Sequence, residues 1–167
     1  YRTPIKFGGR VVNDVVLLNI TVDVETRDGR TAQGFGSMPV GNAWGWPSQE
    51  VDTDSTLAAM TAMGQQVAQA ADDYEEIGHP LEIMHDLAQG YDAISQNANQ
   101  QCGVNEAMPK LAQLVAASPV DAAVHDAYGK ALGENSYNLL GSDYVNRDLS
   151  HYLDDDFAGE TLEQYTL

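Results

Sequence analysis

Apolar and polar residues alternate between positions 16 and 25, and this pattern predicts the first regular element of the chain. A period of two is typical of a strand with one buried face. The apolar positions of this alternation are Val16, Leu18, Ile20, Val22 and Val24. The Asp28-Gly29 dipeptide predicts a tight turn, and residues 31–38 are predicted to form the returning strand. Because a lone hairpin is marginal in water, another strand or a helical layer must cover its apolar face.

Apolar residues recur at steps of three or four after position 50, which predicts amphipathic helices. The first helix should begin near Asp54 or Ser55 and end before Gly78. A second helix should cover residues 81–94 and give way to the polar run at 96–101. Strands followed by helices indicate an α+β fold.

A third helix should begin near Met108, and the Ser118-Pro119 step should break or kink it. Ser118 can cap a new helix, and Pro119 suits the first helical position. Small apolar residues then recur at helical spacing up to Gly133, which is expected to end the helix. The tail after Gly141 has no sustained periodicity and is predicted to be a linker.

The chain has 167 residues, of which 43% are hydrophobic, so one core and one compact domain are expected. Its formal charge of −17 and its pI near 4.2 create a field that repels phosphate groups. We therefore expect neither nucleic acid nor a membrane as a partner. No apolar run approaches the ~20 residues of a membrane span. The single cysteine, Cys102, cannot form an internal disulfide, which favours a reducing compartment and predicts a cytoplasmic protein.

Candidate chemistry is sparse, because phosphate loops, nucleophile elbows and metalloprotease motifs are absent from the sequence. His79 and His85 lie six residues apart, which does not place two ligands on one helical face, so no zinc site is predicted. His125 and Asp126 could form an acid/base pair, but neighbours on a helix point about 100° apart, and structural roles are favoured. Three acidic clusters, interpreted as solvated faces or helix ends, cover residues 52–54, 72–76 and 154–156.

Residues 41–48, GNAWGWPS, contain both tryptophans of the chain, flanked by glycine and proline. Aromatic side chains on a glycine-containing loop can close over a ligand and exclude water. Alternatively, one tryptophan fills the gap between the hairpin and the helices. Both interpretations stay open, and both can be true at once.

Three stretches of the chain together resemble one enzyme family. They are Arg2-Thr3-Pro4 with Phe7-Gly8, the hairpin with its Asp28-Gly29 turn, and DAAVHDAYGKALG at residues 121–133, followed by a Leu-Leu-Gly exit. They resemble the N-terminal capping domain of the enolase superfamily, in its mandelate racemase and muconate lactonizing branch. The resemblance implies an antiparallel hairpin or meander followed by a helical bundle, which caps the mouth of a (β/α) barrel. In such enzymes barrel carboxylates bind Mg²⁺, and barrel lysines or a histidine move the α-proton of a carboxylate substrate.

By this resemblance residues 1–141 form the cap, with the family's first strand expected before Tyr1, and residues 142–167 lead to a barrel that this chain lacks. Two mobile cap loops, mapped to residues 1–9 and 41–48, would line the substrate pocket. The substrate-binding residues that the resemblance implies are Phe7, Gly8, Asn42, Trp44 and Trp46. An exposed apolar face that includes part of residues 120–132 would dock on the barrel.

The resemblance places no catalytic residue and no metal ligand in this chain, which also has no Lys-x-Lys motif. Mg²⁺ would be bound by barrel residues, so this chain alone cannot carry out the reaction. The expected partners are the barrel, in the same protein or on another chain, a small carboxylate substrate and further copies in a homo-oligomer. The complete enzyme would be a racemase, a cycloisomerase or an acid-sugar dehydratase. The alternative is a stand-alone acidic α+β module that binds a ligand or a partner without catalysis.

Overall fold

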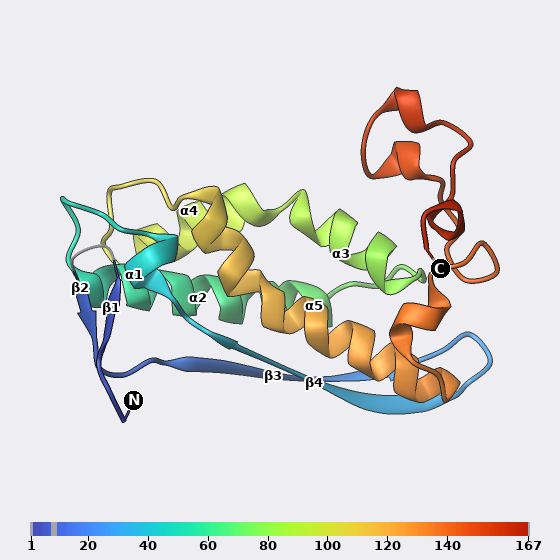
Figure 1. The fold of residues 1–167 in the computed structure, drawn as a ribbon, viewed down its shortest axis with the longest axis horizontal. Helices are drawn as coiled ribbons and strands as arrows, with labels where there is room; N and C mark the ends of the chain where they lie inside the picture. Colours follow the sequence, from blue (N-terminus) through green and yellow to red (C-terminus); the bar gives the residue numbers. More distant parts are fainter. Residues whose placement is uncertain (1, 8–9, 167) are drawn as a thin grey trace.

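The computed structural model describes residues 2–7 and 10–166, apart from the side chains of Phe7 and Arg10. In this part of the chain two antiparallel hairpins come first and five α-helices follow, which confirms the α+β prediction (Figure 1). The hairpins are β1 (Ile5–Phe7) with β2 (Arg10–Val12), and β3 (Leu17–Glu25) with β4 (Thr31–Pro39). The helices are α1 (Asn42–Gly45), α2 (Thr53–Asp72), α3 (Pro80–Ala88), α4 (Tyr91–Gln101) and α5 (Lys110–Leu132). Short 3-10 helices follow in the tail: η1 (Ser136–Leu139), η2 (Leu149–His151), η3 (Asp155–Phe157) and η4 (Leu162–Gln164).

Strands β3 and β4 pair without interruption, from Leu17 opposite Pro39 to Glu25 opposite Thr31, close to the predicted bounds. The turn between them holds Gly29 at φ 81°, a left-handed conformation that glycine adopts without strain. Even-numbered residues of both strands face the helices, and odd-numbered residues are exposed on the other side. The hairpin therefore has an inner and an outer face, and one lengthwise edge along each strand.

Helix α5 lies against the inner face of β4, where the strand has two glycines. A Cβ atom on Gly34 would come within 2.1 Å of the Ala123 carbonyl oxygen, and one on Gly36 within 1.9 Å of the Pro119 carbonyl oxygen. The absence of side chains at these positions lets the helix backbone approach the strand closely. Ala127 is fully buried in the same contact.

Helix α2 covers β3 near the middle of the molecule. A Cβ atom on Gly64 would meet the Leu18 side chain at 2.2 Å and the Ala116 carbonyl oxygen at 2.8 Å, so α2 packs closely on both β3 and α5. Asp52 caps α2 by accepting the Ser55 N–H, which confirms that this acidic cluster is a helix end. In Figure 1, α3 and α4 lie farther from the hairpin than α2 and α5 do.

Helix α5 is continuous, so of the two outcomes predicted at Ser118-Pro119 the break is wrong, and the kink stays a prediction. Proline lacks the N–H that would donate to the Val115 carbonyl oxygen one turn earlier. The Ser118 hydroxyl donates to that oxygen instead, at 3.1 Å, and Ser118 lies inside the helix rather than at its start. Gly133, at φ 72°, ends the helix as predicted. None of the large exposed apolar side chains among the described residues lies between positions 120 and 132, so this half of the helix contributes only smaller or half-buried side chains to an exposed apolar face.

The single helix predicted over residues 81–94 is also wrong, because α3 and α4 are separate helices with Gly90 between them. The polar run at 96–101 belongs to α4. It is helical because Ala98 and Asn99 pack toward the core while the other residues of the run face solvent. The polar residues of this run thus form the outer face of α4, although the sequence predicted that the helix would end there.

The tail after α5 is attached to α3. Asn146 donates from its backbone N–H and from Nδ2 to the Glu82 carboxylate, at 2.9 and 2.8 Å. Leu139 and Leu149 are buried, and the segment that follows projects from the body of the molecule (Figure 1). That residues 142–167 lead to a barrel stays a prediction.

Candidate functional site

The two segments predicted to line a substrate pocket both lie at the open end of the β3-β4 hairpin, away from its turn. The chain enters β3 from β2 at that end, and it leaves β4 toward α1. Of the predicted loop at residues 1–9, Tyr1, Gly8 and Gly9 lie outside the described residues, and Phe7 belongs to β1. Residues 2–4 of this segment belong to no strand, and residues 5–7 pair with β2, which lies outside it; that the segment lines a substrate pocket stays a prediction.

Two of the predicted substrate-binding residues lie in the interior. Trp46 is only 1% exposed, and its Nε1 donates to Glu106 at 2.7 Å. The buried Asn42 side chain donates to the Thr53 carbonyl oxygen at 2.7 Å and to the Thr56 hydroxyl at 3.0 Å. In this structure both side chains attach α1 to the helical layer, which corresponds to the core-filling interpretation of the loop.

Trp44 reaches the surface, with a relative exposure of 37%. It covers Gly41, where a Cβ atom would lie 2.0 Å from the Trp44 Nε1. The substrate-binding role of Phe7, Gly8, Asn42, Trp44 and Trp46 stays a prediction.

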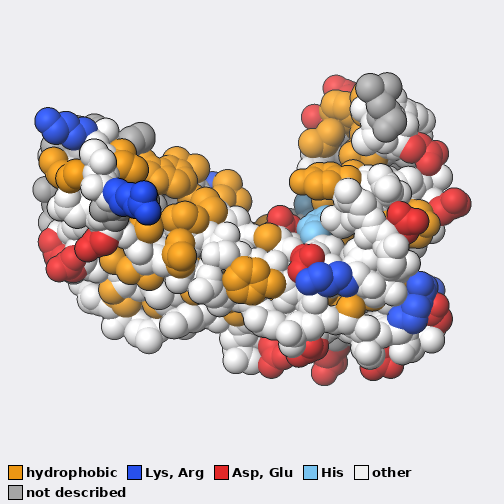
Figure 2. Space-filling view, turned by 60° about the horizontal axis from the view of Figure 1, so that its bottom comes forward, with side chains coloured by type: hydrophobic (Ala, Val, Ile, Leu, Met, Phe, Trp, Pro, Cys, Tyr) orange, Lys and Arg blue, Asp and Glu red, His pale blue; other side chains and the backbone are white. Residues whose placement is uncertain are grey.

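Large exposed apolar side chains gather at the same open end. The start of α5 belongs to this region, because a Cβ on Gly45 of α1 would lie 3.7 Å from the Ala112 Cα. Figure 2 shows hydrophobic side chains grouped over one end of the molecule. We call this set the open-end apolar surface; its members are Ile5, Val11, Val15, Val16, Leu17, Trp44, Leu111 and Leu114.

The hydrogen bonds of the hairpin decide which backbone groups each strand turns outward. At one end Val40 donates to the Val16 carbonyl oxygen, and at the other Thr26 donates to the Arg30 carbonyl oxygen. The register between these pairs is unbroken, so even-numbered residues bond across the hairpin. The N–H and C=O groups of odd-numbered residues therefore point to the two outer edges.

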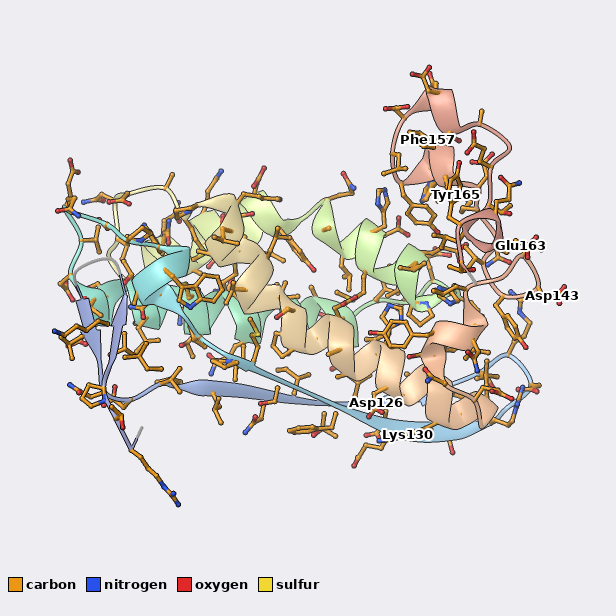
Figure 3. The ribbon with its side chains drawn as sticks, in the orientation of Figure 1. Asp126, Lys130, Asp143, Phe157, Glu163 and Tyr165 are labelled. Atoms are coloured by element: carbon orange, nitrogen blue, oxygen red, sulfur yellow. The ribbon has the colours of Figure 1, made fainter. Side chains whose placement is uncertain are left out.

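Side chains of α5 pair with the outward backbone groups of the β4 edge. The Phe35 N–H donates to Asp126 Oδ2 at 2.8 Å, and Lys130 Nζ donates to the Gln33 carbonyl oxygen at 3.2 Å. Lys130 also donates to Asp126, at 2.6 Å (Figure 3). The Lys130 hydrogen bond, then the Phe35 N–H, hold the pKa of Asp126 below its usual value. Helix α5 thus pairs with two outward backbone groups of this edge, at Gln33 and Phe35.

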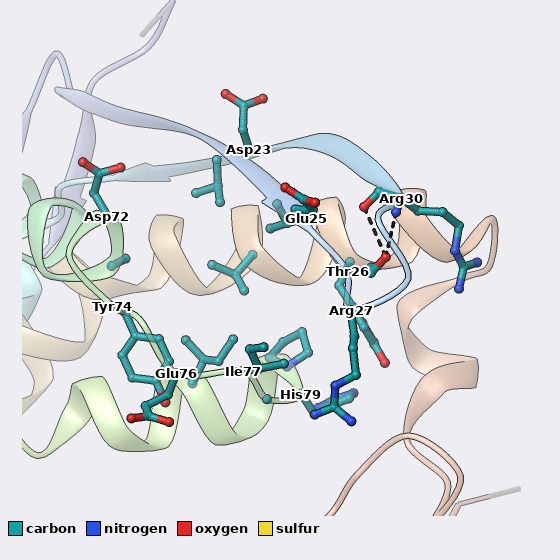
Figure 4. A pocket seen from close by; sticks show the side chains of 18 of the residues that line it. Asp23, Glu25, Thr26, Arg27, Arg30, Asp72, Tyr74, Glu76, Ile77 and His79 are labelled. Carbon is teal, nitrogen blue, oxygen red and sulfur yellow. Dashed lines mark hydrogen bonds between the residues drawn. The ribbon is translucent and has the colours of Figure 1, made fainter.

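A pocket of about 1000 Å³ lies along β3, toward the turn of the hairpin (Figure 4). We call it the β3 groove. One wall is β3 itself from residue 20 onward, and the other is the connection at residues 74–79 between α2 and α3. Val124, Tyr128 and Leu132 of α5, together with the end of α2, line it between these walls. The groove lies toward the turn, so it is separate from the predicted loops at the open end.

The β3 edge supplies unpaired backbone groups to this groove. Thr21, Asp23 and Glu25 line it, and their N–H and C=O groups point away from β4. Within residues 2–7 and 10–166, these groups have no hydrogen-bond partner. Among the described residues, α5 therefore bonds to backbone groups of the β4 edge, whereas the outward backbone groups of the β3 edge have no partner.

His79, at the far wall of the groove, has no free ring nitrogen. Its Nδ1 accepts the Leu81 N–H, so Nε2 carries the proton and donates to the Leu139 carbonyl oxygen at 3.0 Å. Burial, and then the neighbouring His125, lower the pKa of His79, which keeps the ring neutral. This histidine holds the tail in place and is not poised for proton transfer.

Two of the tyrosines that line the groove have a raised pKa. Burial, and then a hydrogen bond to Asp86, raise the pKa of Tyr74 to about 12, and burial raises the pKa of Tyr128. Both phenols stay protonated at neutral pH. The groove offers backbone groups and apolar surface to a ligand.

The fold brings the four histidines together in two pairs, which sequence spacing did not indicate. His79 lies 6.0 Å from His125 between ring centroids, and His85 lies 4.7 Å from His151. Among the described residues, no group of three or more potential ligand side chains could hold a metal ion. His125 contacts Asp121 at 3.7 Å and not its neighbour in sequence, as expected for adjacent residues on a helix.

Comparisons with protein-family models, with curated proteins and with solved structures gave no match to this chain. Within the described residues, no helix combines the length and the apolar character that crossing a bilayer requires. The function therefore has to be inferred from the residues and their geometry.

Sequence reasoning missed the β3 groove and its lining residues. One signal was available, because a strand with a single predicted pairing partner leaves one edge unpaired. No local pattern indicated that residues 74–79, some fifty positions later in the chain, would form the opposite wall.

Proposed function

We propose that this chain is the capping domain of a mandelate racemase-type enzyme, in which a barrel carries out Mg²⁺-dependent abstraction of an α-proton from a carboxylate substrate. The proposal combines the sequence resemblance with the order of hairpin and helices. The observation that carries it is the open-end apolar surface, which gathers at the end where both predicted substrate loops lie. Exposed apolar areas of this kind mark sites where another protein surface docks.

In this proposal the two tryptophans have different tasks. Trp44, which is partly exposed, contacts the substrate or closes the pocket mouth and excludes water from the charged intermediate. Trp46, held by Glu106, fixes the loop from beneath. The barrel supplies the Mg²⁺ ligands and the base.

The first test is the polypeptide encoded after Leu167. The proposal expects a (β/α) barrel with a carboxylate trio and with lysines or a histidine as bases. Purified alone, the present chain should show no Mg²⁺-dependent turnover of any α-hydroxy or sugar acid. Measurable turnover by this chain, or a complete gene without a barrel on this or a partner chain, would contradict the proposal.

The second test uses the complete enzyme. Trp44→Ala should raise KM or shift substrate preference by about 5- to 150-fold, which corresponds to ~1–3 kcal/mol for one apolar pocket contact. The matched control is Trp46→Ala, which should lower the melting temperature because it opens a buried cavity. If Trp44→Ala leaves the kinetics unchanged, Trp44 does not line the pocket.

The second candidate is a stand-alone binding module, and the β3 groove is the observation that favours it. A monomeric protein that binds no hydrophobic dye, encoded without a barrel, would support this candidate over the cap.

A further inference from the structure

We infer that the contact between His79 and the tail after α5, residues 134–166, is an acid-sensitive latch: when His79 takes up a proton, the tail is released from the start of α3. The device couples the pH around the protein to the position of the tail. This inference goes beyond the proposed function and does not rest on it, because all the contacts involved lie within the present chain.

The hydrogen bonds of the His79 ring are the first reason. Its Nδ1 accepts the Leu81 N–H at 3.1 Å and so caps α3, while its Nε2 donates to the Leu139 carbonyl oxygen. An N–H can only donate and a carbonyl oxygen can only accept, so these two partners require the neutral ring. A proton added at Nδ1 faces the Leu81 N–H, and its charge lies at the helix N-terminus, where the dipole disfavours cations.

The attachment of the tail to the same helix end is the second reason. Glu82 accepts the His79 N–H at 2.8 Å, so the two residues form one capping box. Both members of this box hold the tail, because His79 bonds to Leu139 and the Glu82 carboxylate accepts two hydrogen bonds from Asn146. Loss of the His79 cap therefore loosens both attachments of the tail.

The surroundings of His79 disfavour a positive charge on its ring. The residue is only 2% exposed, so a charge there loses its hydration. From α5, the ring centroid of His125 lies 6.0 Å away and that of Tyr128 lies 5.1 Å away. Arg27 of the hairpin turn and Tyr144 of the tail line the same groove as His79. A second proton, on His125, would place two cations side by side.

Three neighbouring groups act in the opposite direction. The Leu139 carbonyl group and the Glu82 carboxylate favour a charge on His79, and Asp121, at 3.7 Å, favours a charge on His125. Burial outweighs these groups, so the pKa of each histidine lies below its usual value.

The direction of the pH response follows from these contacts. In the released tail His79 regains an ordinary pKa of about 6.5, which is higher than in the docked state. Docking is therefore complete above about pH 7 and weakens as the pH falls below about 6.5. Burial raises the pKa of Glu82, but hydrogen bonds from the His79 N–H and from Asn146 outweigh it and keep this pKa below its usual value. Glu82 thus stays ionised down to about pH 5, and the response above that pH comes from histidine.

The test is NMR of the present chain between pH 7.5 and pH 5. Hydrogen exchange of the Asn146 amide, divided by its intrinsic rate at each pH, measures how often the tail opens. Opening should increase by roughly 5- to 30-fold at pH 5, where the upper limit is set by an ordinary histidine in the open state. The imidazole nitrogen shifts of His79 should change over the same pH range. The amide of Val120, in the core of the domain, should keep its protection.

Three matched variants assign the response to one histidine. His79→Asn keeps a neutral oxygen that can cap α3 but does not titrate, so the pH response of Asn146 should disappear. His125→Gln should reduce the response without abolishing it. His85→Gln, in the outer histidine pair between α3 and the tail, should leave it unchanged. The nitrogen shifts of His79 follow the same proton uptake in the unmodified protein, so the result does not depend on the folding of a variant.

Three results would overturn the inference. The first is a protection of Asn146 that does not change between pH 7.5 and pH 5. The second is a response that persists in His79→Asn or disappears in His85→Gln, because another group would then control the tail. The third is a loss of protection at Val120 together with Asn146, because the whole domain would then unfold. None of these results bears on the barrel or on Trp44, so the proposed function is tested separately.

Discussion

The two edges of the β3-β4 hairpin differ, although the strands are equally long and pair in perfect register. At the β4 edge, Asp126 and Lys130 of α5 bond to one outward N–H, of Phe35, and one outward carbonyl oxygen, of Gln33. The β3 edge faces a groove and has no such partner among the described residues. Exposed strand edges invite pairing with other chains, and proteins usually protect them. Among the described residues, only the β4 edge receives such bonds.

The difference begins with side-chain size. Gly34 and Gly36 let α5 touch β4, so the helix is close enough for its side chains to reach the edge. The corresponding inward positions of β3 are Val22 and Ile20, which hold the helices farther from that strand. Small residues on one strand and branched residues on the other thus place the groove on the β3 side.

The largest expected effect comes from filling the β4 contact. Gly36→Val would direct a side chain into the Pro119 carbonyl group, 1.9 Å from the position of Cβ, and should lower the free energy of unfolding by about 3 kcal/mol or more. Urea denaturation measures this change. The control is Ser37→Ala on the outer face, where a change within about 0.5 kcal/mol is expected. An unchanged denaturation midpoint for Gly36→Val would mean that α5 does not lie on β4.

A smaller effect is expected on the helix side of the same contact. Ala127→Leu should overpack the space against Gly34 and cost roughly 1–3 kcal/mol. Ala122→Leu, at an exposed position of the same helix, is the matched control and should be nearly neutral. Thermal unfolding of both variants checks which face of α5 packs on β4. If the two melting temperatures fall by equal amounts, Ala127 does not face the strand.

A pair of proline variants compares the two edges directly, because Thr21 and Phe35 are opposite each other. Phe35→Pro removes the N–H that donates to Asp126, whereas Thr21→Pro removes an N–H that has no partner among the described residues. Relative to valine at each position, proline should cost about 1.5–3 kcal/mol more at 35 than at 21, the value of one hydrogen bond to a charged group. Chemical denaturation measures both losses of unfolding free energy. If proline costs the same at the two positions, the Phe35 N–H gains nothing from Asp126 and the two edges do not differ.

The smallest expected effect is a pH dependence at the closed edge. The pKa of Asp126 is lower in the folded protein than in the unfolded chain, so its stabilisation is present above about pH 4 and is lost as the pH falls through the folded pKa. Because Lys130 is half-exposed, the contribution should be about 0.5 kcal/mol. Asp126→Asn should therefore narrow the stability difference between pH 7 and pH 3 by that amount. If both proteins lose stability identically, the carboxylate does not support the edge.

The sequence predicted the parts of the fold that depend on local patterns. The alternation at 16–24 and the Asp28-Gly29 turn predicted the hairpin, and the helix start near Asp54 was one or two residues from the observed bounds. The break at Pro119 was wrong because the Ser118 hydroxyl satisfies the carbonyl group that proline leaves unpaired. That bond depends on a side-chain rotamer, which no pattern of apolar residues encodes.

The candidate site was less predictable, because it depends on contacts between distant segments. The burial of Trp46 rather than Trp44 follows from its hydrogen bond to Glu106, sixty residues away. The β3 groove likewise forms only when residues 74–79 lie opposite β3. Composition and spacing could indicate that tryptophans or strand edges matter, but not which of them stay exposed.

Amide hydrogen exchange, measured by NMR on the free protein, tests the open edge most directly. The account predicts an alternation along β3, in which Ile20 and Val22 are protected by their bonds to β4 while Thr21 and Asp23 exchange much faster. On β4, Phe35 should be protected by Asp126 although it belongs to the outward set. Protection of Thr21 and Asp23 equal to that of Ile20 and Val22 would show that the β3 edge is already paired, and would contradict the account.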